Sequence, residues 1–168
     1  MKKLIVQNDN TLIDGNFSYS CASGKGGRCP ANEKTEGDGA SPIGSWRLKR
    51  VFFRADKISK PKTRLPTRVI DPDDGWCDAP EDPSYNRLVK RPYPASHEAM
   101  WRADHVYDVV VEIAHNDSPP IPDRGSAIFM HVAHSDYRAT EGCIALALTD
   151  LLKILETADT ETELDIRG

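Results

Sequence analysis

The sequence predicts a mainly β domain with one helix near its C-terminus. Short runs of alternating or continuous apolar residues, separated by turn signals, fill the first third of the chain. A near-continuous apolar run covers Tyr107–Ala114, which is typical of a buried strand. Near the C-terminus, four aliphatic residues share one face at helical spacing, namely Leu151, Leu152, Ile154 and Leu155. These three observations define the expected fold class.

Length and composition fit one domain over residues 1–168. Hydrophobic residues make up 39% of the chain and charged residues 29%, which is ordinary for a globular domain with a hydrophobic core. The net charge is -4, and no block of Lys or Arg stands without acids nearby. Because phosphate binding needs a concentrated basic surface, we expect no nucleic-acid partner.

The first third of the chain reads as strands joined by turns. Asp14-Gly15 is a hairpin signal, and residues 22–41 form a loop rich in Gly, Lys and acids. The expected strands are Leu4–Val6, Thr11–Ile13, Asn16–Cys21 and Trp46–Phe53.

The middle of the chain, Arg54–Pro94, has little periodic pattern. It contains seven prolines and the acidic run Asp71–Asp74. Such a segment is either a functional excursion or lid, or a solvated loop. The acidic run lacks the spacing of a calcium loop, so we expect solvation rather than a metal site. Ser96–Trp101 is expected to form a short helix with Ser96 as its N-cap.

The last third predicts two more strands and the helix. After Tyr107–Ala114, three prolines break the pattern, and Ala127–Val132 is the next expected strand. Ile144–Leu148 is apolar, and Thr149 is expected to cap the C-terminal helix.

Neither the cysteine spacing nor the N-terminus indicates a metal site or an export signal. Cys21, Cys29, Cys77 and Cys143 form no Cys-x-x-Cys pair, which argues against structural zinc. Cys21 and Cys29 flank a Gly-rich loop and are either paired or reduced, depending on the compartment. The apolar run after Lys3 is too short for a secretory signal, and no stretch approaches the ~20 apolar residues of a membrane span.

His131 and Cys143 are the candidate catalytic residues. An imidazole at the end of an apolar strand is costly unless it has a hydrogen-bonding role. A thiol directly after Gly142 lies where the backbone can approach closely and supply N–H groups to an oxyanion. The two residues are twelve positions apart, so adjacent strands can bring them together. The alternative is a buried structural thiol and a satisfied core histidine.

These segments resemble the active-site signature of the L,D-transpeptidase catalytic domain family. That signature is a strand-borne His, a loop, then Ser/Thr-His-Gly-Cys and an apolar residue; Thr140–Ile144 matches its second part. Glu36–Trp46 is similar to the Thr-Pro-x-Gly-x-aromatic turn of the family. The order His before Cys distinguishes the family from papain-like proteins. The resemblance covers Gly37–Leu155 and points to a compact proteobacterial branch.

The resemblance implies a β-sandwich or barrel with a C-terminal helix, and Cys143 as nucleophile with His131 as base. It also implies a monomer that acts in the periplasm on peptidoglycan stem peptides, with no metal or organic cofactor. The His131 imidazole is expected to lower the pKa of the thiol below ~8.5. The backbone carbonyl of Val132 or Ala133 is a candidate orienter of His131. Expected oxyanion or substrate contacts are Gly142, Glu141, Thr140, Tyr137 and Arg138.

Two departures from the family pattern affect substrate contacts. The usual His before Gly-Cys is Glu141, and the frequent Arg or Asn two places after Cys is Ala145. These changes imply that the donor peptide sits differently from that of the better-known members. The resemblance to a compact branch implies the L-Ala–diaminopimelate (1-3) crosslink as the alternative to the 3-3 type, and both stay open because Glu141 could instead pair with Arg138. Two alternatives stay open: hydrolysis by the same Cys-His pair, as an L,D-carboxypeptidase or endopeptidase, or a catalytically silent domain that binds cell wall.

Overall fold

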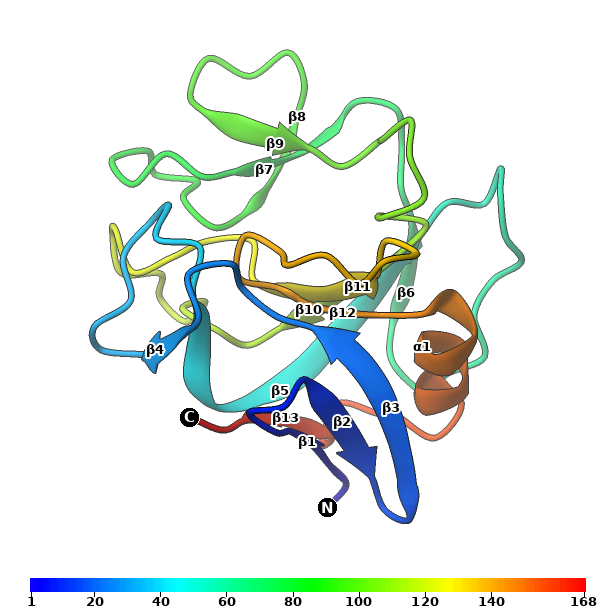
Figure 1. Cartoon of the computed structure of the whole chain (residues 1–168). Coiled ribbons are helices and arrows are strands. Elements are labelled where there is room, and N and C mark those ends of the chain that lie inside the picture. The colour runs from blue at the N-terminus through cyan, green and yellow to red at the C-terminus, as the bar shows by residue number, and fades with distance from the viewer.

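The large β-sheet closes on itself into a barrel-like structure. In the computed structural model, which describes residues 1–168, the strands follow the order β10-β11-β12-β3-β2-β1-β13-β5-β4, and β5 also pairs with β10 (Figure 1). The elements are β1 (Lys3–Val6), β2 (Thr11–Asp14), β3 (Phe17–Ala22), β4 (Arg28–Pro30), β5 (Ser41–Phe53), β6 (Thr67–Val69), β7 (Asp74–Cys77), β8 (Leu88–Lys90), β9 (His97–Ala99), β10 (Val109–Ile113), β11 (Phe129–Val132), β12 (Ile144–Leu146), α1 (Leu148–Leu155) and β13 (Glu163–Ile166). The expected fold class is confirmed.

Strand β5 closes the barrel because it is long enough to pair at both ends. Its first part, Gly44–Arg47, pairs with β13, and its second part, Leu48–Phe53, pairs with β10. The alternation of residues in Trp46–Phe53 predicted only the second half of this strand. The β10 partner is the near-continuous apolar run of the sequence, and all five of its residues are buried.

The main core fills the space between the barrel wall and α1. Leu151, Ile154 and Leu155 of the helix are buried against aliphatic residues of the sheet, including Met130 and Ile144. Each such side chain contributes about 1.5–3 kcal/mol through burial. The prediction that Thr149 caps the helix is wrong: Ala147 is the N-cap, and no side chain makes a cap hydrogen bond. The helix begins earlier because Leu148 joins its first turn.

Residues 74–99 contain a small separate sheet. Strand β7 lies between β8 and β9, and this sheet sits at the side of the barrel opposite both termini (Figure 1). The predicted helix over Ser96–Trp101 is wrong, because His97–Ala99 pairs with Gly75–Cys77 as β9. Strand pairing has overridden the local helical pattern. No helix in the structure is both long and apolar enough to cross a membrane.

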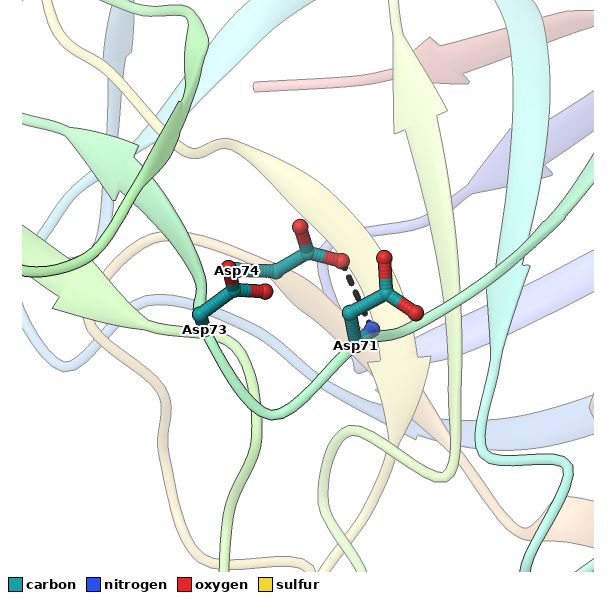
Figure 2. Close-up of side chains that lie close together, drawn as sticks. All are labelled: Asp71, Asp73 and Asp74. Atoms are coloured by element: carbon teal, nitrogen blue, oxygen red, sulfur yellow. Dashed lines mark hydrogen bonds between the residues drawn. The ribbon is translucent and has the colours of Figure 1, made fainter.

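The acidic run Asp71–Asp74 is anchored rather than simply solvated. Asp71, Asp73 and Asp74 lie together (Figure 2), and the Asp74 carboxylate accepts a hydrogen bond from the Asp71 N–H at 2.8 Å. Asp74 has no exposed side-chain surface and pairs with Arg68 at 2.8 Å and Lys90 at 2.9 Å. The expectation of a solvated run is therefore wrong for Asp74, while Asp71 and Asp73 are exposed.

Candidate active site

Cys143 directly precedes β12, at a point where the chain passes very close to the segment around Ala40. Gly142 has φ 130°, and a Cβ atom at this position would lie 2.8 Å from the Ala40 carbonyl oxygen. Only glycine therefore fits the turn that presents the thiol. This agrees with the close backbone approach that the Gly-Cys pair predicts.

The thiol is held by the backbone of the segment that leads into β11. The Phe129 N–H donates to Sγ at 3.3 Å, and the thiol donates to the Ala127 carbonyl oxygen at 3.2 Å. Burial raises the pKa of Cys143 to about 12; the Phe129 N–H lowers it, and the Glu98 carboxylate raises it further. The resting thiol is therefore protonated at neutral pH, contrary to the expected pKa below ~8.5.

His131 is fixed in one orientation on β11. Its Nδ1 lies 3.0 Å from the Val132 carbonyl oxygen. Because a carbonyl only accepts, Nδ1 carries the proton and Nε2 is left as the basic nitrogen. Burial is the main reason that the pKa of His131 falls to about 4, although the Val132 carbonyl raises it. Val132 is thus the orienting carbonyl of the two candidates.

The strand register places the two side chains on the same face of the sheet. β11 and β12 are parallel, with His131 opposite Ala145, and Cys143 directly precedes β12. Alternate residues of a strand share a face, so the intervening Met130 and Ile144 enter the main core instead. Cys143 and His131 both line one cavity of about 460 Å³.

The loop before Cys143 is tied to itself and to the N-terminal third of the chain. Thr140 Oγ1 donates to the Cys143 carbonyl at 2.7 Å and accepts from the Gly142 N–H at 3.1 Å. Ser41 Oγ donates to the Gly142 carbonyl at 2.7 Å. The Lys25 N–H donates to the Thr140 carbonyl at 2.7 Å. In this arrangement the Gly142 N–H is engaged by Thr140, so it is not free for an oxyanion.

The expected substrate-contact residues are only partly brought together. Arg138, Thr140 and Glu141 line the cavity, whereas Tyr137 and Gly142 do not. Glu141 pairs with Lys25 at 2.7 Å, and Arg138 pairs with Asp136 at 3.1 Å. The pairing of Glu141 with Arg138 that the sequence left open is therefore absent.

Several cavity residues were missed by sequence reasoning. Tyr107 places its ring edge-on to His131 with centroids 5.5 Å apart, and its hydroxyl donates to Glu98. Further charged or polar lining residues are Lys34, Glu36, Asp78, Arg102 and Ser126. Of these residues only Asp78 lies in the Arg54–Pro94 segment, and Glu98 and Arg102 follow it closely in the sequence. Apart from Glu36, which begins the Glu36–Trp46 segment, none of the polar lining residues named here is marked by a motif.

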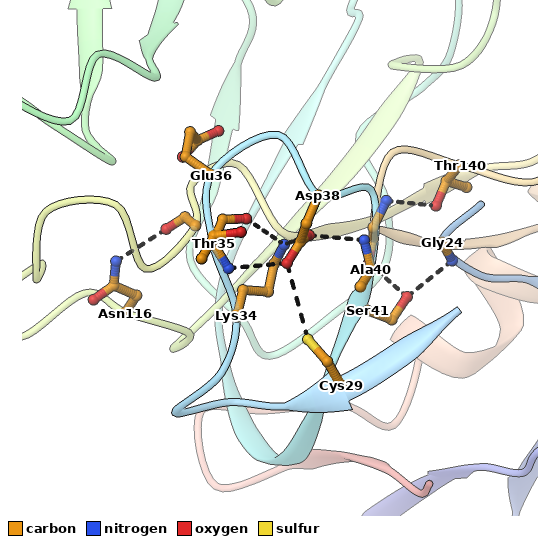
Figure 3. A network of polar contacts seen from close by, with 12 residues as sticks. Gly24, Cys29, Lys34, Thr35, Glu36, Asp38, Ala40, Ser41, Asn116 and Thr140 are labelled. Atoms are coloured by element: carbon orange, nitrogen blue, oxygen red, sulfur yellow. Dashed lines mark hydrogen bonds and ion pairs between the residues drawn. The ribbon is translucent and has the colours of Figure 1, made fainter. Parts of the chain in front are cut away.

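A polar network supports the loop that carries Glu36 (Figure 3). Lys34 is only 2% exposed and pairs with Asp38. The Asp38 carboxylate also accepts from the backbone N–H groups of Thr35 and Ala40, each at 2.9 Å. Cys29 lies at the edge of this network and, like Cys21, is a free thiol.

Comparison with known proteins identifies the family. The family model of the L,D-transpeptidase catalytic domain (YkuD) matches residues 2–166. Neither the search of curated proteins nor that of solved structures gave a match. The match covers essentially the whole chain and includes His131, the loop and Cys143. The chain therefore belongs to the L,D-transpeptidase catalytic domain family.

Proposed function

We propose that this chain forms stem-peptide crosslinks in peptidoglycan through a thioester on Cys143. The observation that carries the proposal is the placement of Cys143 and His131 on one face of two parallel strands, lining one cavity. His131 Nε2 has no hydrogen bond within the protein, and its Nδ1 is fixed by Val132. A neutral imidazole with a free Nε2 can take a proton from a thiol, once that thiol turns away from the Ala127 carbonyl to which it donates in the resting site.

The reaction has two acyl transfers. In the first, Nε2 of His131 takes the thiol proton as Sγ attacks the carbonyl carbon of a stem-peptide amide. The resulting tetrahedral oxyanion collapses, the C–N bond breaks, and the leaving amine takes the proton from the imidazolium. In the second, an acceptor amine attacks the thioester while Nε2 accepts its proton. The C–S bond breaks and the thiolate recovers that proton.

Burial of Cys143 and His131 keeps both groups uncharged before the first step. With a thiol pKa of about 12 and an imidazole pKa of about 4, the pair rests as neutral thiol and neutral imidazole. Proton transfer is therefore coupled to attack on a bound donor rather than completed beforehand. Because the Gly142 N–H already donates to Thr140, we assign the Cys143 N–H as the oxyanion donor.

We propose that the enzyme acts as a monomer in the periplasm, because the family acts on peptidoglycan. Fractionation of cells is the direct test. Recovery of the native protein in the periplasmic fraction is expected, and its confinement to the cytosol would contradict the proposal.

The bond attacked in the donor decides the crosslink type. Attack at the diaminopimelate–D-Ala bond gives 3-3 crosslinks. Attack at the L-Ala–D-Glu bond releases the rest of the stem peptide and gives 1-3 crosslinks, in which the donor L-Ala is joined to the acceptor diaminopimelate. Ala145 lies opposite His131 and lines the cavity, so it leaves space where a longer side chain would stand. We propose the 1-3 product on this ground, with Glu141 balanced by Lys25.

Mass spectrometry of products separates these outcomes. The protein is incubated with disaccharide tetrapeptides, and dimers are sequenced by tandem mass spectrometry, with Cys143→Ala as the inactive control. Dimers linked through L-Ala support the 1-3 assignment, and dimers linked only between diaminopimelate residues refute it. Release of amino acid or shortened peptide without dimers would indicate the hydrolytic alternative. Absence of all products would favour a silent binding domain.

A further inference from the structure

The cavity that contains Cys143 has an acidic wall built from three distant parts of the chain. The wall consists of Glu36 from the loop before β5, Asp78 directly after β7, and Glu98 in β9. Figure 3 shows Glu36 beside the network of Lys34 and Asp38. The fold thus gathers three carboxylates into a cavity where the proposed reaction needs only a thiol and an imidazole.

The cationic side chains that line the cavity already have carboxylate partners elsewhere. The pairs are Lys34–Asp38 at 2.5 Å, Arg102–Asp104 at 2.7 Å and Arg138–Asp136 at 3.1 Å. The fourth acidic lining residue, Glu141, is paired with Lys25 outside the cavity. Among the charged residues that line the cavity, only Glu36, Asp78 and Glu98 of the acidic wall lack an ion pair.

Neutral hydroxyls are the side-chain partners of two wall residues. Tyr85 donates to Glu36 at 2.5 Å, and Tyr107 donates to Glu98. Such hydroxyls orient a carboxylate but carry no full positive charge, and Lys34 and Arg102 offset the charges of Glu36 and Glu98 only from a distance, without an ion pair. Burial raises the pKa of both Glu36 and Glu98, and each is raised further by Asp78. A cation placed among the three would relieve this repulsion.

Two buried polar atoms at the wall also lack partners. Asp78 Oδ1 and Ser126 Oγ are buried without a hydrogen bond of good geometry, although Ser126 lies close enough to Glu36 to lower the pKa of that carboxyl. Ser126 is only 8% exposed and lines the same cavity. Buried polar atoms are nearly always satisfied in folded proteins, so two orphans at one wall point to a ligand that donates hydrogen bonds.

We propose that Glu36, Asp78, Glu98 and Ser126 form a subsite for a primary ammonium group of the donor substrate. An ammonium carries three N–H donors and one positive charge, which matches the orphaned oxygens and the unpaired carboxylates. On the proposed function, on which this inference rests, the group is the side-chain ammonium of the donor's diaminopimelate.

The wall fits the donor better than the acceptor. An acceptor amine must lose its proton before it attacks the thioester, and neighbouring carboxylates favour the protonated amine. The same carboxylates suit a donor amine that stays protonated throughout. The subsite would therefore orient the donor and keep its own amine from reacting.

A binding experiment tests this inference without turnover. Full-length Cys143→Ala protein is titrated in a calorimeter with N-acetyl-L-Ala-γ-D-Glu-meso-diaminopimelate-D-Ala, and with the same peptide acetylated on the side-chain amine. Acetylation removes the charge, and we expect it to weaken binding about tenfold or more, as for loss of a charge-assisted contact. Adding Asp78→Asn and Glu98→Gln should reduce this ratio to about twofold or less.

The controls keep the inference separate from the proposed function. Glu81→Gln, at an exposed position three residues beyond Asp78, should leave the full effect of acetylation in place. Equal affinity of Cys143→Ala protein for the two peptides would overturn the subsite, and this comparison needs no wall variant to fold. Crosslinking by the unmodified protein is measured separately. Dimers without an acetylation effect would refute the subsite alone, whereas an acetylation effect without dimers would refute the transpeptidase reaction alone.

Discussion

The backbone N–H of Phe129 lies 3.3 Å from the Sγ of Cys143 and donates to it. Phe129 begins β11, the strand that also carries His131, so one strand both contacts the sulfur and presents the proposed base. An N–H donor favours the thiolate over the thiol, but burial has the larger effect and raises the pKa of Cys143 to about 12. The Cys143 thiol, the proposed nucleophile, is therefore held in place without being ionised.

Alkylation of Cys143 should increase with pH without levelling off below about pH 10. A raised thiol pKa means that the thiolate fraction keeps growing tenfold per pH unit through the neutral and mildly alkaline range. The measurement is the iodoacetamide reaction rate at Cys143, read by peptide mass mapping so that Cys21, Cys29 and Cys77 do not interfere. A plateau below pH 8.5 would show a preformed thiolate.

Glu98→Gln should raise the alkylation rate of Cys143 at a fixed pH. The Glu98 carboxylate raises the pKa of the thiol, so removing its charge lowers that pKa and enlarges the thiolate fraction. A decrease of half a pKa unit gives about a threefold faster reaction at pH 8. Glu81→Gln serves as the exposed control, and an equal effect of both variants would contradict the role of Glu98.

Asp74→Asn should destabilise the fold by about 2 kcal/mol or more at pH 7. The carboxylate is fully buried, and its removal leaves Arg68 and Lys90 without their buried partner. Although burial raises the pKa of Asp74, hydrogen bonds from Arg68, Lys90 and Asp71 bring it below the ordinary value. Its stabilisation is therefore present above about pH 4 and lost as the pH falls through the lower folded-state pKa.

Urea unfolding of both proteins at pH 7 measures the difference. Exposed Asp73→Asn is the matched control and should change the free energy of unfolding by less than about 0.5 kcal/mol. Equal stabilities of Asp74→Asn and the unmodified protein would show that the buried ion pairs contribute nothing.

Thr149→Ala should change the free energy of unfolding by less than about 0.5 kcal/mol. Thr149 lies inside α1 and makes no capping hydrogen bond, so the cost of about 1 kcal/mol for a lost N-cap does not apply. Leu151→Ala, by contrast, empties a fully buried site and should cost about 2–5 kcal/mol. A decrease near 1 kcal/mol in the free energy of unfolding of Thr149→Ala would show that Thr149 does cap the helix in solution.

The sequence predicts several barrel strands because their apolar patterns are local. Strands β10 and β11 lie within the expected ranges Tyr107–Ala114 and Ala127–Val132, whereas β12 and β13 were not predicted as strands. The β9 strand was mistaken for a helix because its three residues gain their conformation from pairing with β7, a partner distant in sequence. Local propensity carries no information on such pairing.

The sequence predicts that His131 and Cys143 lie close together, and both line one cavity, whereas nothing in the sequence predicts the acidic wall. A His at the end of an apolar strand and a Cys after Gly are local signals with chemical meaning. Glu36, Asp78 and Glu98 form an acidic wall only because the fold brings three separate segments of the chain together. The expected effect of His131 on the thiol pKa also failed, because sequence does not reveal that both groups are buried.

Intact mass spectrometry of the protein with a disaccharide tetrapeptide donor tests the central claim most directly. We predict a covalent acyl adduct that tandem mass spectrometry locates on Cys143 and that hydroxylamine releases, as expected for a thioester. Cys143→Ala should show neither adduct nor dimers, while Cys21→Ala, Cys29→Ala and Cys77→Ala retain both. Full crosslinking activity in the Cys143→Ala protein would contradict the assignment of Cys143 as the nucleophile.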